Sequence, residues 1–206
     1  MNNSSTDWAY LQKFQQENEA LKRQSDENRI VFIGDSIIAG WNSYPFFANN
    51  PRFINRGING QTTAQILHRF HHDVVELKPK CVVILAGTND VAENLGPVTL
   101  DQIKNNLEAM VSLATAYKIN IILCSILPVT EYYWNKNIKP FEKIQAINRD
   151  LRQISIDSNL LYIDFYEKFV KNRQLNPKYS NDGVHPNKVG YPVMSTVFTN
   201  HSAEIM

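Results

Sequence analysis

Cysteine is scarce in this chain, which has only Cys81 and Cys124 among its 206 residues. Two cysteines cannot form the disulfide framework of a small secreted domain, and no Cys/His spacing typical of a structural zinc site is present. Both cysteines lie inside or beside apolar runs, so we expect small buried side chains in neighbouring strands. A single disulfide between them remains the alternative.

Long apolar runs and an excess of one charge are also missing. No apolar stretch approaches the roughly 20 residues that cross a bilayer, so we expect no membrane insertion. The formal net charge of +1 argues against nucleic acid as a partner, because such proteins carry a concentrated basic face. Residues 1–7 are polar and lack the plan of a signal peptide, which predicts a cytoplasmic protein as written. A periplasmic or secreted protein whose leader had been removed would look the same.

Histidine is limited to five residues, and two of them, His68 and His72, lie four positions apart. This spacing would place both on one helix face, where they could act as metal ligands. His71 and Asp73 beside them indicate a solvated polar face instead. We therefore predict no metal site here.

The remaining composition, 43% hydrophobic and 20% charged, is typical of a globular protein of one domain over residues 1–206. An amphipathic pattern over 7–25 predicts a flanking helix, with Asp7 as its N-cap, before a core spanning 30–198. Apolar segments predict strands near 30–34, 53–54, 81–86, 120–124 and 160–165. Helical patterns follow near 63–77, 99–118, 140–157 and from Pro186 onward. This alternation predicts an α/β fold, a three-layer α/β/α sandwich around a five-stranded parallel sheet.

Four polar turns follow elements whose ends should meet at one edge of that sheet. They are Gly34-Asp35-Ser36, the loop ending at Gly60, residues 87–90 and residues 182–185. Any one of them would more often be an ordinary turn or helix cap. Together they supply a hydroxyl, an imidazole, a carboxylate and amide donors, which are the groups that acyl transfer by serine needs.

Each group has a candidate residue. Ser36 supplies the hydroxyl, His185 the general base, and Asp182 the carboxylate that orients the base. The backbone N–H groups of Ser36 and Gly60, together with the side-chain amide of Asn89, are the candidate donors to the oxyanion.

These four blocks resemble those of the SGNH hydrolases, the GDSL esterase/lipase superfamily, and its platelet-activating-factor acetylhydrolase-like and bacterial acyl esterase branch. The blocks here are Gly34-Asp35-Ser36, Gly60, Gly87-Thr88-Asn89-Asp90 and Asp182-Gly183-Val184-His185. The resemblance implies a flavodoxin-like topology, a Ser36–His185–Asp182 triad, an oxyanion hole of Ser36, Gly60 and Asn89, and no cofactor. Gly57 lies in the same loop as Gly60 and is the less favoured alternative.

The predicted function is that of a serine hydrolase acting on short-chain O-acyl esters, such as acetyl esters of a carbohydrate or another small molecule. One alternative is a thioesterase or lysophospholipase with a longer acyl groove. Another is a non-catalytic carbohydrate-binding module on the same fold. Candidate pocket residues are Asp35, Trp41, Tyr133 and Trp134. For Asp35 and Asp90 we favour hydrogen bonds to the backbone of their own turns.

Overall fold

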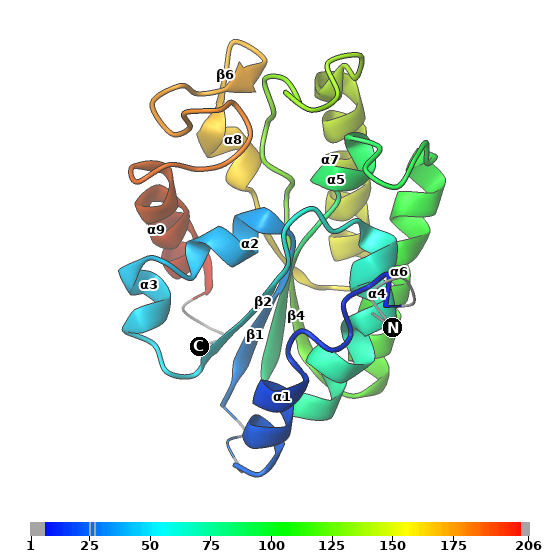
Figure 1. Cartoon of the computed structure of the whole chain (residues 1–206), viewed down its shortest axis with the longest axis vertical. Helices are drawn as coiled ribbons and strands as arrows, with labels where there is room; N and C mark the ends of the chain where they lie inside the picture. Colours follow the sequence, from blue (N-terminus) through cyan, green and yellow to red (C-terminus); the bar gives the residue numbers. More distant parts are fainter. Residues whose placement is uncertain (1–6, 25, 27, 203–206) are drawn as a thin grey trace, which may run out of the picture.

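A sheet of five parallel strands forms the centre of the computed structural model, which describes residues 7–24, 26 and 28–202 (Figure 1). The strands are β1 (Ile30–Gly34), β2 (Phe53–Gly57), β3 (Cys81–Leu85), β4 (Asn120–Cys124) and β5 (Leu161–Ile163). Their spatial order is β2-β1-β3-β4-β5, and all four pairings are parallel. This is the flavodoxin-like order, so the predicted α/β class and topology are confirmed.

Helices cover both faces of the sheet, because alternate residues of each buried strand point to opposite sides. In β1, Val31 and Ile33 pack into one apolar cluster, whereas Ile30 and Phe32 pack into the other. The first cluster lies under α4 (Thr63–Asp73), the 3₁₀ helix η2 (Val75–Leu77), α5 (Thr88–Val91), α6 (Leu100–Ala116) and α7 (Pro140–Asp157). The second lies under α2 (Ser36–Trp41), α3 (Pro45–Ala48), α8 (Phe165–Phe169) and α9 (Gly190–Ser202).

Strand β2 is longer than the sequence predicts. Asn55, Arg56 and Gly57 continue the ladder with β1, in register with Phe32, Ile33 and Gly34, respectively. The sequence predicts an end to the strand at Ile54, because the apolar pattern stops there and polar residues follow. Gly57 is needed in the strand because a Cβ there would lie 2.1 Å from the backbone nitrogen of Ala39 in α2. Strand β5, in contrast, is shorter than the predicted 160–165.

The N-terminal helix is also shorter than predicted, because among the described residues 7–24 only Gln15–Lys22 (α1) is helical. Residues 7–14 form turns, and Tyr10 has a φ of +58°, which a right-handed helix does not accommodate. The prediction of Asp7 as the helix N-cap was therefore wrong, because the residue before the helix is Phe14. The Asp7 carboxylate instead accepts hydrogen bonds from the backbone N–H groups of Leu11 and Gln12 within the turns.

The sequence did not predict the short helices α2, α3 and α5, or the hairpin of β6 (Val170–Lys171) and β7 (Gln174–Leu175). Helix α9 begins at Gly190 rather than Pro186, because Pro186 forms an isolated bridge with Ser180. Cys81 and Cys124 are both buried and free, as favoured above. Within the described ranges, none of the helices combines the length and apolar character needed to cross a membrane.

Candidate active site

Three neighbouring strands end together and deliver three of the predicted site residues. Gly34, the last residue of β1, lies in register with Gly57 of β2 and Leu85 of β3. Ser36 follows β1, Gly60 follows β2, and Asn89 follows β3 within α5. The strand order reverses between β1 and β3, and ligands of such sheets bind at this switch point.

Ser36 is the first residue of α2, at a tight turn after β1. Its neighbour Asp35 caps the helix, accepting a hydrogen bond at Oδ1 from the Ile37 N–H at 2.9 Å. A Cβ at Gly34 would lie 2.2 Å from the carbonyl oxygen of Leu85, so only glycine fits this close strand contact. The turn directs the Ser36 hydroxyl toward His185, and Oγ lies 2.9 Å from His185 Nε2.

His185 and Asp182 come from the loop that precedes α9. His185 Nδ1 lies 2.7 Å from Asp182 Oδ2, while Asp182 Oδ1 accepts hydrogen bonds from the backbone N–H groups of Val184 and His185. Partial burial by itself would raise the pKa of Asp182. These hydrogen bonds outweigh it and lower that pKa to about 2, so the carboxylate is ionised at neutral pH.

Asn89 is nearly fully buried, and its Nδ2 donates to the carbonyl oxygen of Gln61 at 3.0 Å. Because an amide nitrogen carries two N–H bonds, one remains for a ligand. The carboxylate of its neighbour Asp90 reaches beyond its own turn to α4. It accepts hydrogen bonds from the backbone N–H and the hydroxyl of Thr63, at 2.8 and 2.6 Å, and so holds the start of α4.

A cleft of about 570 Å³ contains the residues brought together at these strand ends. Ser36, His185, Gly60 and Asn89 all line it, and so do Tyr10, Asn59, Gln61, Gln65, Asn94, Leu95, Tyr133 and Trp134. Tyr133 and Trp134 are 59% and 41% exposed, so their rings are available to a ligand. A second cleft meets the first at Ser36 and His185 and is lined in part by Tyr10 and Tyr191.

Comparison with known proteins finds relatives over nearly the whole chain. The sequence profile of the GDSL-like lipase/acylhydrolase family matches residues 32–193. The chain belongs to this family.

Two similar solved structures are a proposed acylhydrolase of Bacteroides fragilis and a GDSL-like lipase of Bacteroides thetaiotaomicron. The first is 41% identical with a TM-score of 0.92, and the alignment covers 98% of this chain and 100% of that one. The second is 39% identical with a TM-score of 0.91, over 96% and 99% of the two chains. An acetylxylan esterase of Geobacillus stearothermophilus is 28% identical over 71% of this chain and 70% of its own length. This GDSL acylhydrolase is therefore a carboxylic ester hydrolase of the SGNH superfamily.

Two of the predicted pocket residues of this acylhydrolase lie in its interior instead. Trp41 is fully buried, stacks on Phe46 at a ring distance of 4.7 Å and donates from Nε1 to Ser195 Oγ at 2.9 Å. Asp35 is also fully buried, as the cap of α2. The prediction of a pocket role was wrong for both. Closeness to Ser36 in sequence does not place a side chain in the cleft, because α2 turns its apolar face into the core.

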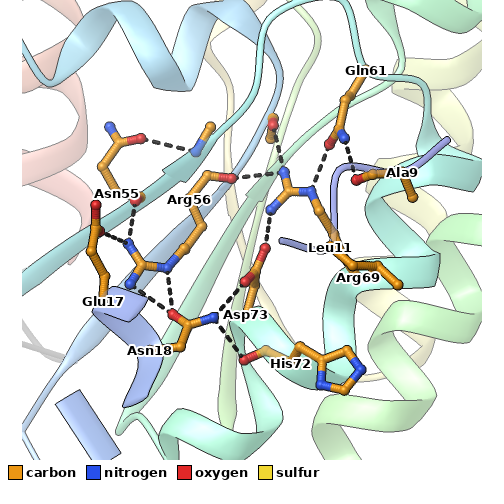
Figure 2. Close-up of polar contacts among 12 residues, drawn as sticks. Ala9, Leu11, Glu17, Asn18, Asn55, Arg56, Gln61, Arg69, His72 and Asp73 are labelled. Atoms are coloured by element: carbon orange, nitrogen blue, oxygen red, sulfur yellow. Dashed lines mark hydrogen bonds and ion pairs between the residues drawn. The ribbon is translucent and has the colours of Figure 1, made fainter. Parts of the chain in front are cut away.

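The buried Arg69 makes a network of hydrogen bonds next to the strand ends that carry the acylhydrolase site (Figure 2). The guanidinium of Arg69 donates to the carbonyl oxygens of Gly34 and Arg56, at 3.0 and 2.7 Å, and to Gln61 Oε1 at 2.6 Å. Asp73 balances its charge at 2.8 Å. Arg69 thus ties together the ends of β1 and β2 and the loop that carries Gly60. The sequence offered no sign of this role, since Arg69 reads as the polar side of an amphipathic helix.

Sequence reasoning also missed Tyr10 and Asn94 as cleft residues. Tyr10 belongs to the N-terminal segment that precedes the residues matched by the family profile. Buried Gln61 and Gln65 hold this segment, donating to the carbonyl oxygens of Ala9 and Trp8 at 2.8 and 2.6 Å. Asn94 lies four residues beyond the Gly87–Asp90 block, so the motif itself does not include it.

The histidines near α4 lie outside this site, on exposed surface. The His68 ring packs 5.3 Å from the ring of Trp8, whereas His72 Nδ1 lies 2.9 Å from Glu76 Oε1. Within the described part of the chain, His71, His72 and Glu76 form the cluster that could hold a metal ion. Lys22 already provides a cation there, since its ammonium lies 2.9 Å from Glu76 Oε2.

Ionisation of the buried Asp35 carboxyl destabilises the folded protein as the pH rises, and replacing Asp35 with asparagine should remove this effect. Burial raises the pKa of Asp35 from 3.8 to about 7, so the folded protein keeps this proton at pH values where the unfolded chain has lost it. The contribution of Asp35 to the stability of the natural protein therefore falls as the pH rises from about 4 to about 7. We expect the Tm of Asp35→Asn, measured relative to the natural protein, to increase across this window.

Thermal unfolding at pH 4.5, 6 and 8 checks this expectation. Asp90 is also buried, and its charge is one of the causes that raise the pKa of Asp35, so the comparison is repeated in an Asp90→Asn background. Asp101→Asn, at an exposed position in the first turn of α6, controls for the loss of one carboxylate. A Tm difference for Asp35→Asn that stays constant with pH would contradict the interpretation.

Proposed function

We propose that this acylhydrolase cleaves O-acyl esters through an acyl-enzyme on Ser36. The observation that carries the proposal is the continuous hydrogen-bonded chain from hydroxyl to carboxylate. Ser36 Oγ lies 2.9 Å from His185 Nε2, and His185 Nδ1 lies 2.7 Å from Asp182 Oδ2. A serine, a base within hydrogen-bond reach and a group that orients the base are the components of nucleophilic catalysis.

In this mechanism, Ser36 Oγ attacks the ester carbonyl carbon while His185 Nε2 takes the hydroxyl proton. The imidazolium lies against ionised Asp182, which stabilises its charge. The Ser36 and Gly60 N–H groups and the Asn89 amide donate to the oxyanion. His185 then gives its proton to the leaving alcohol, and a water molecule activated by the same imidazole releases the acid.

For the substrate, we propose a short acyl group, such as acetyl, on a carbohydrate. The rings of Tyr133 and Trp134 line the same cleft as the side-chain amide of Asn59. Aromatic faces together with an amide suit a sugar, which presents apolar C–H faces and hydroxyl groups. The similarity to an acetylxylan esterase supports the same substrate class.

The acyl specificity can be measured with p-nitrophenyl esters from acetyl to palmitoyl, with Ser36→Ala as the blank. We expect kcat/KM to be highest for acetyl or butyryl and to fall by about tenfold or more by octanoyl. The reason is that steric contact between the cleft and the added methylene groups weakens binding of the transition state. A maximum beyond octanoyl would contradict the short-chain proposal and favour a thioesterase or lysophospholipase.

Labelling with a fluorophosphonate, followed by mass spectrometry of the modified peptide, tests the nucleophile directly. We expect modification at Ser36, because its hydroxyl already faces the base. Folded protein that remains unlabelled would contradict the mechanism and revive the alternative of a binding module. Release of acetate from acetylated xylo-oligosaccharides, compared with acetylated amino sugars, then tests the carbohydrate part of the proposal.

A further inference from the structure

The side chain of Asn94 joins the loop that carries Gly60 to helix α5, which carries Asn89. Its Nδ2 lies 2.9 Å from Asn89 Oδ1 and 3.1 Å from the carbonyl oxygen of Gly60. Its backbone N–H also donates to the Asn89 carbonyl oxygen at 3.0 Å. An amide nitrogen has two N–H bonds, so Asn94 donates one hydrogen bond to Gly60 and the other to Asn89.

These contacts determine which end of the Asn89 amide faces which neighbour. Asn89 Oδ1 accepts from Asn94, while Asn89 Nδ2 donates to the carbonyl oxygen of Gln61 at 3.0 Å. Rotating this amide by half a turn would set N–H against N–H at one end and oxygen against oxygen at the other. Stabilisation of an oxyanion requires the N–H end, so the direction of this amide matters for the reaction.

Trp134 in turn holds Asn94. The Trp134 Nε1–H donates to Asn94 Oδ1 at 2.8 Å, so both ends of the Asn94 amide are engaged. The Trp134 ring packs 5.2 Å from the ring of buried Tyr132, whose hydroxyl donates to the carbonyl oxygen of Thr88 at 2.9 Å. Thr88 directly precedes Asn89, and the loop bearing Trp134 is therefore anchored to the helix that bears Asn89.

We propose that Asn94 is a positioning residue of the oxyanion hole and that Trp134 fixes it through the indole N–H. This inference rests on the proposed function, since it takes Asn89 and Gly60 as the oxyanion donors. Asn94 acts through these two residues, by fixing their direction before the substrate arrives. Because Trp134 also lines the cleft, a substrate group packed on the indole shields its hydrogen bond to Asn94 from water.

Steady-state kinetics with p-nitrophenyl acetate test the proposal. Loss of a complete oxyanion donor costs about 10²- to 10³-fold in kcat, so we expect a smaller loss, about 30-fold, for Asn94→Ala, with KM within about twofold. Trp134→Phe keeps an aromatic ring but removes the N–H donor, and we expect it to lower kcat about threefold, again with little change in KM.

Asn135→Ala is the matched control, because Asn135 lies next to Trp134 and anchors the same loop. Its Nδ2 donates to the carbonyl oxygen of Ala92 at 3.0 Å, away from the Asn94 amide. We expect Asn135→Ala to leave kcat within about twofold, since it removes no contact to the oxyanion donors. A loss as large as that of Asn94→Ala would overturn the proposal, because it would reflect general loosening of the loop.

A double-mutant cycle with Asn89→Ala tests whether Asn94 acts through Asn89. A purely structural role of Asn94 would lower kcat by the same factor with and without Asn89. With Asn89 already truncated, Asn94→Ala should cost only about threefold, through Gly60, because residues that act as a unit are not additive. The full 30-fold loss in that background would overturn the proposal. Unchanged kcat in Asn94→Ala beside a large loss in Asn89→Ala refutes only this inference, whereas unchanged kcat in Asn89→Ala refutes the oxyanion hole itself.

Discussion

Ser36→Ala is expected to lower kcat for p-nitrophenyl acetate by about 10⁴-fold or more, the loss typical of removing a serine nucleophile. The physical reason is that alanine has no oxygen to attack the carbonyl carbon. The remaining oxyanion donors can only assist attack by water. The cost in stability should be small, because alanine suits the first turn of α2 and the cap comes from Asp35.

The matched control for Ser36 is Ser43→Ala, an exposed serine seven residues further along the chain. It should retain full activity. Circular dichroism and the Tm of both variants establish that they are folded. Activity of Ser36→Ala within tenfold of the natural enzyme would exclude Ser36 as the nucleophile, whatever the distance to His185.

Asp182→Asn is expected to lower kcat by about 10³- to 10⁴-fold, because the neutral amide supports the wrong tautomer of the base. Asp182 Oδ2 lies 2.7 Å from His185 Nδ1 and accepts a hydrogen bond from the Nδ1–H group in the natural enzyme. An amide N–H in this place donates to Nδ1, which moves the imidazole proton to Nε2. His185 Nε2, 2.9 Å from Ser36 Oγ, then cannot accept the serine proton.

Ser180→Ala serves as the comparison for Asp182→Asn. The Ser180 hydroxyl donates to Asp182 Oδ1 at 3.1 Å, so its removal weakens the loop but leaves the carboxylate in place. We expect kcat to fall by less than about tenfold, since the carboxylate stays ionised and keeps its hydrogen bonds from the backbone N–H groups of Val184 and His185 and from the His185 ring. Equal losses in Ser180→Ala and Asp182→Asn would show that loop geometry, rather than the tautomer, governs the rate.

Two segments, residues 7–14 and 55–57, adopt a secondary structure other than the one that their sequence predicts. In both segments the structure depends on hydrogen bonds to distant parts of the chain. Residues 55–57 lack an apolar pattern and yet form the end of β2. The reason is that the Arg56 side chain donates to Asn18 Oδ1, while the Arg56 carbonyl oxygen accepts a hydrogen bond from Arg69. Residues 7–14 have a helical pattern and yet form turns, because buried Gln61 and Gln65 hold the backbone at Trp8 and Ala9. In both places, long-range hydrogen bonds override the local pattern.

The predicted pocket residues also show that local sequence does not determine where a side chain lies. Trp41 and Trp134 are both tryptophans near the site, and nothing in the local sequence separates their roles. The structure buries Trp41 completely and leaves Trp134 41% exposed in the cleft. The difference arises because α2 packs Trp41 into the apolar cluster on one face of the sheet, whereas Trp134 lines the cleft together with Ser36 and His185.

The sequence by itself determined the alternation of strands and helices, the turns that carry Ser36, Asn89, Asp182 and His185, and the family. The strands, helices and turns are local, because each depends on the pattern within one short segment, and the family follows from the order of four such segments along the chain. Only the tertiary structure decided that Asn94 bridges Gly60 and Asn89, and which aromatic rings line the cleft. Such contacts join segments that are far apart in sequence, and their geometry exists only once the sheet has brought those segments together.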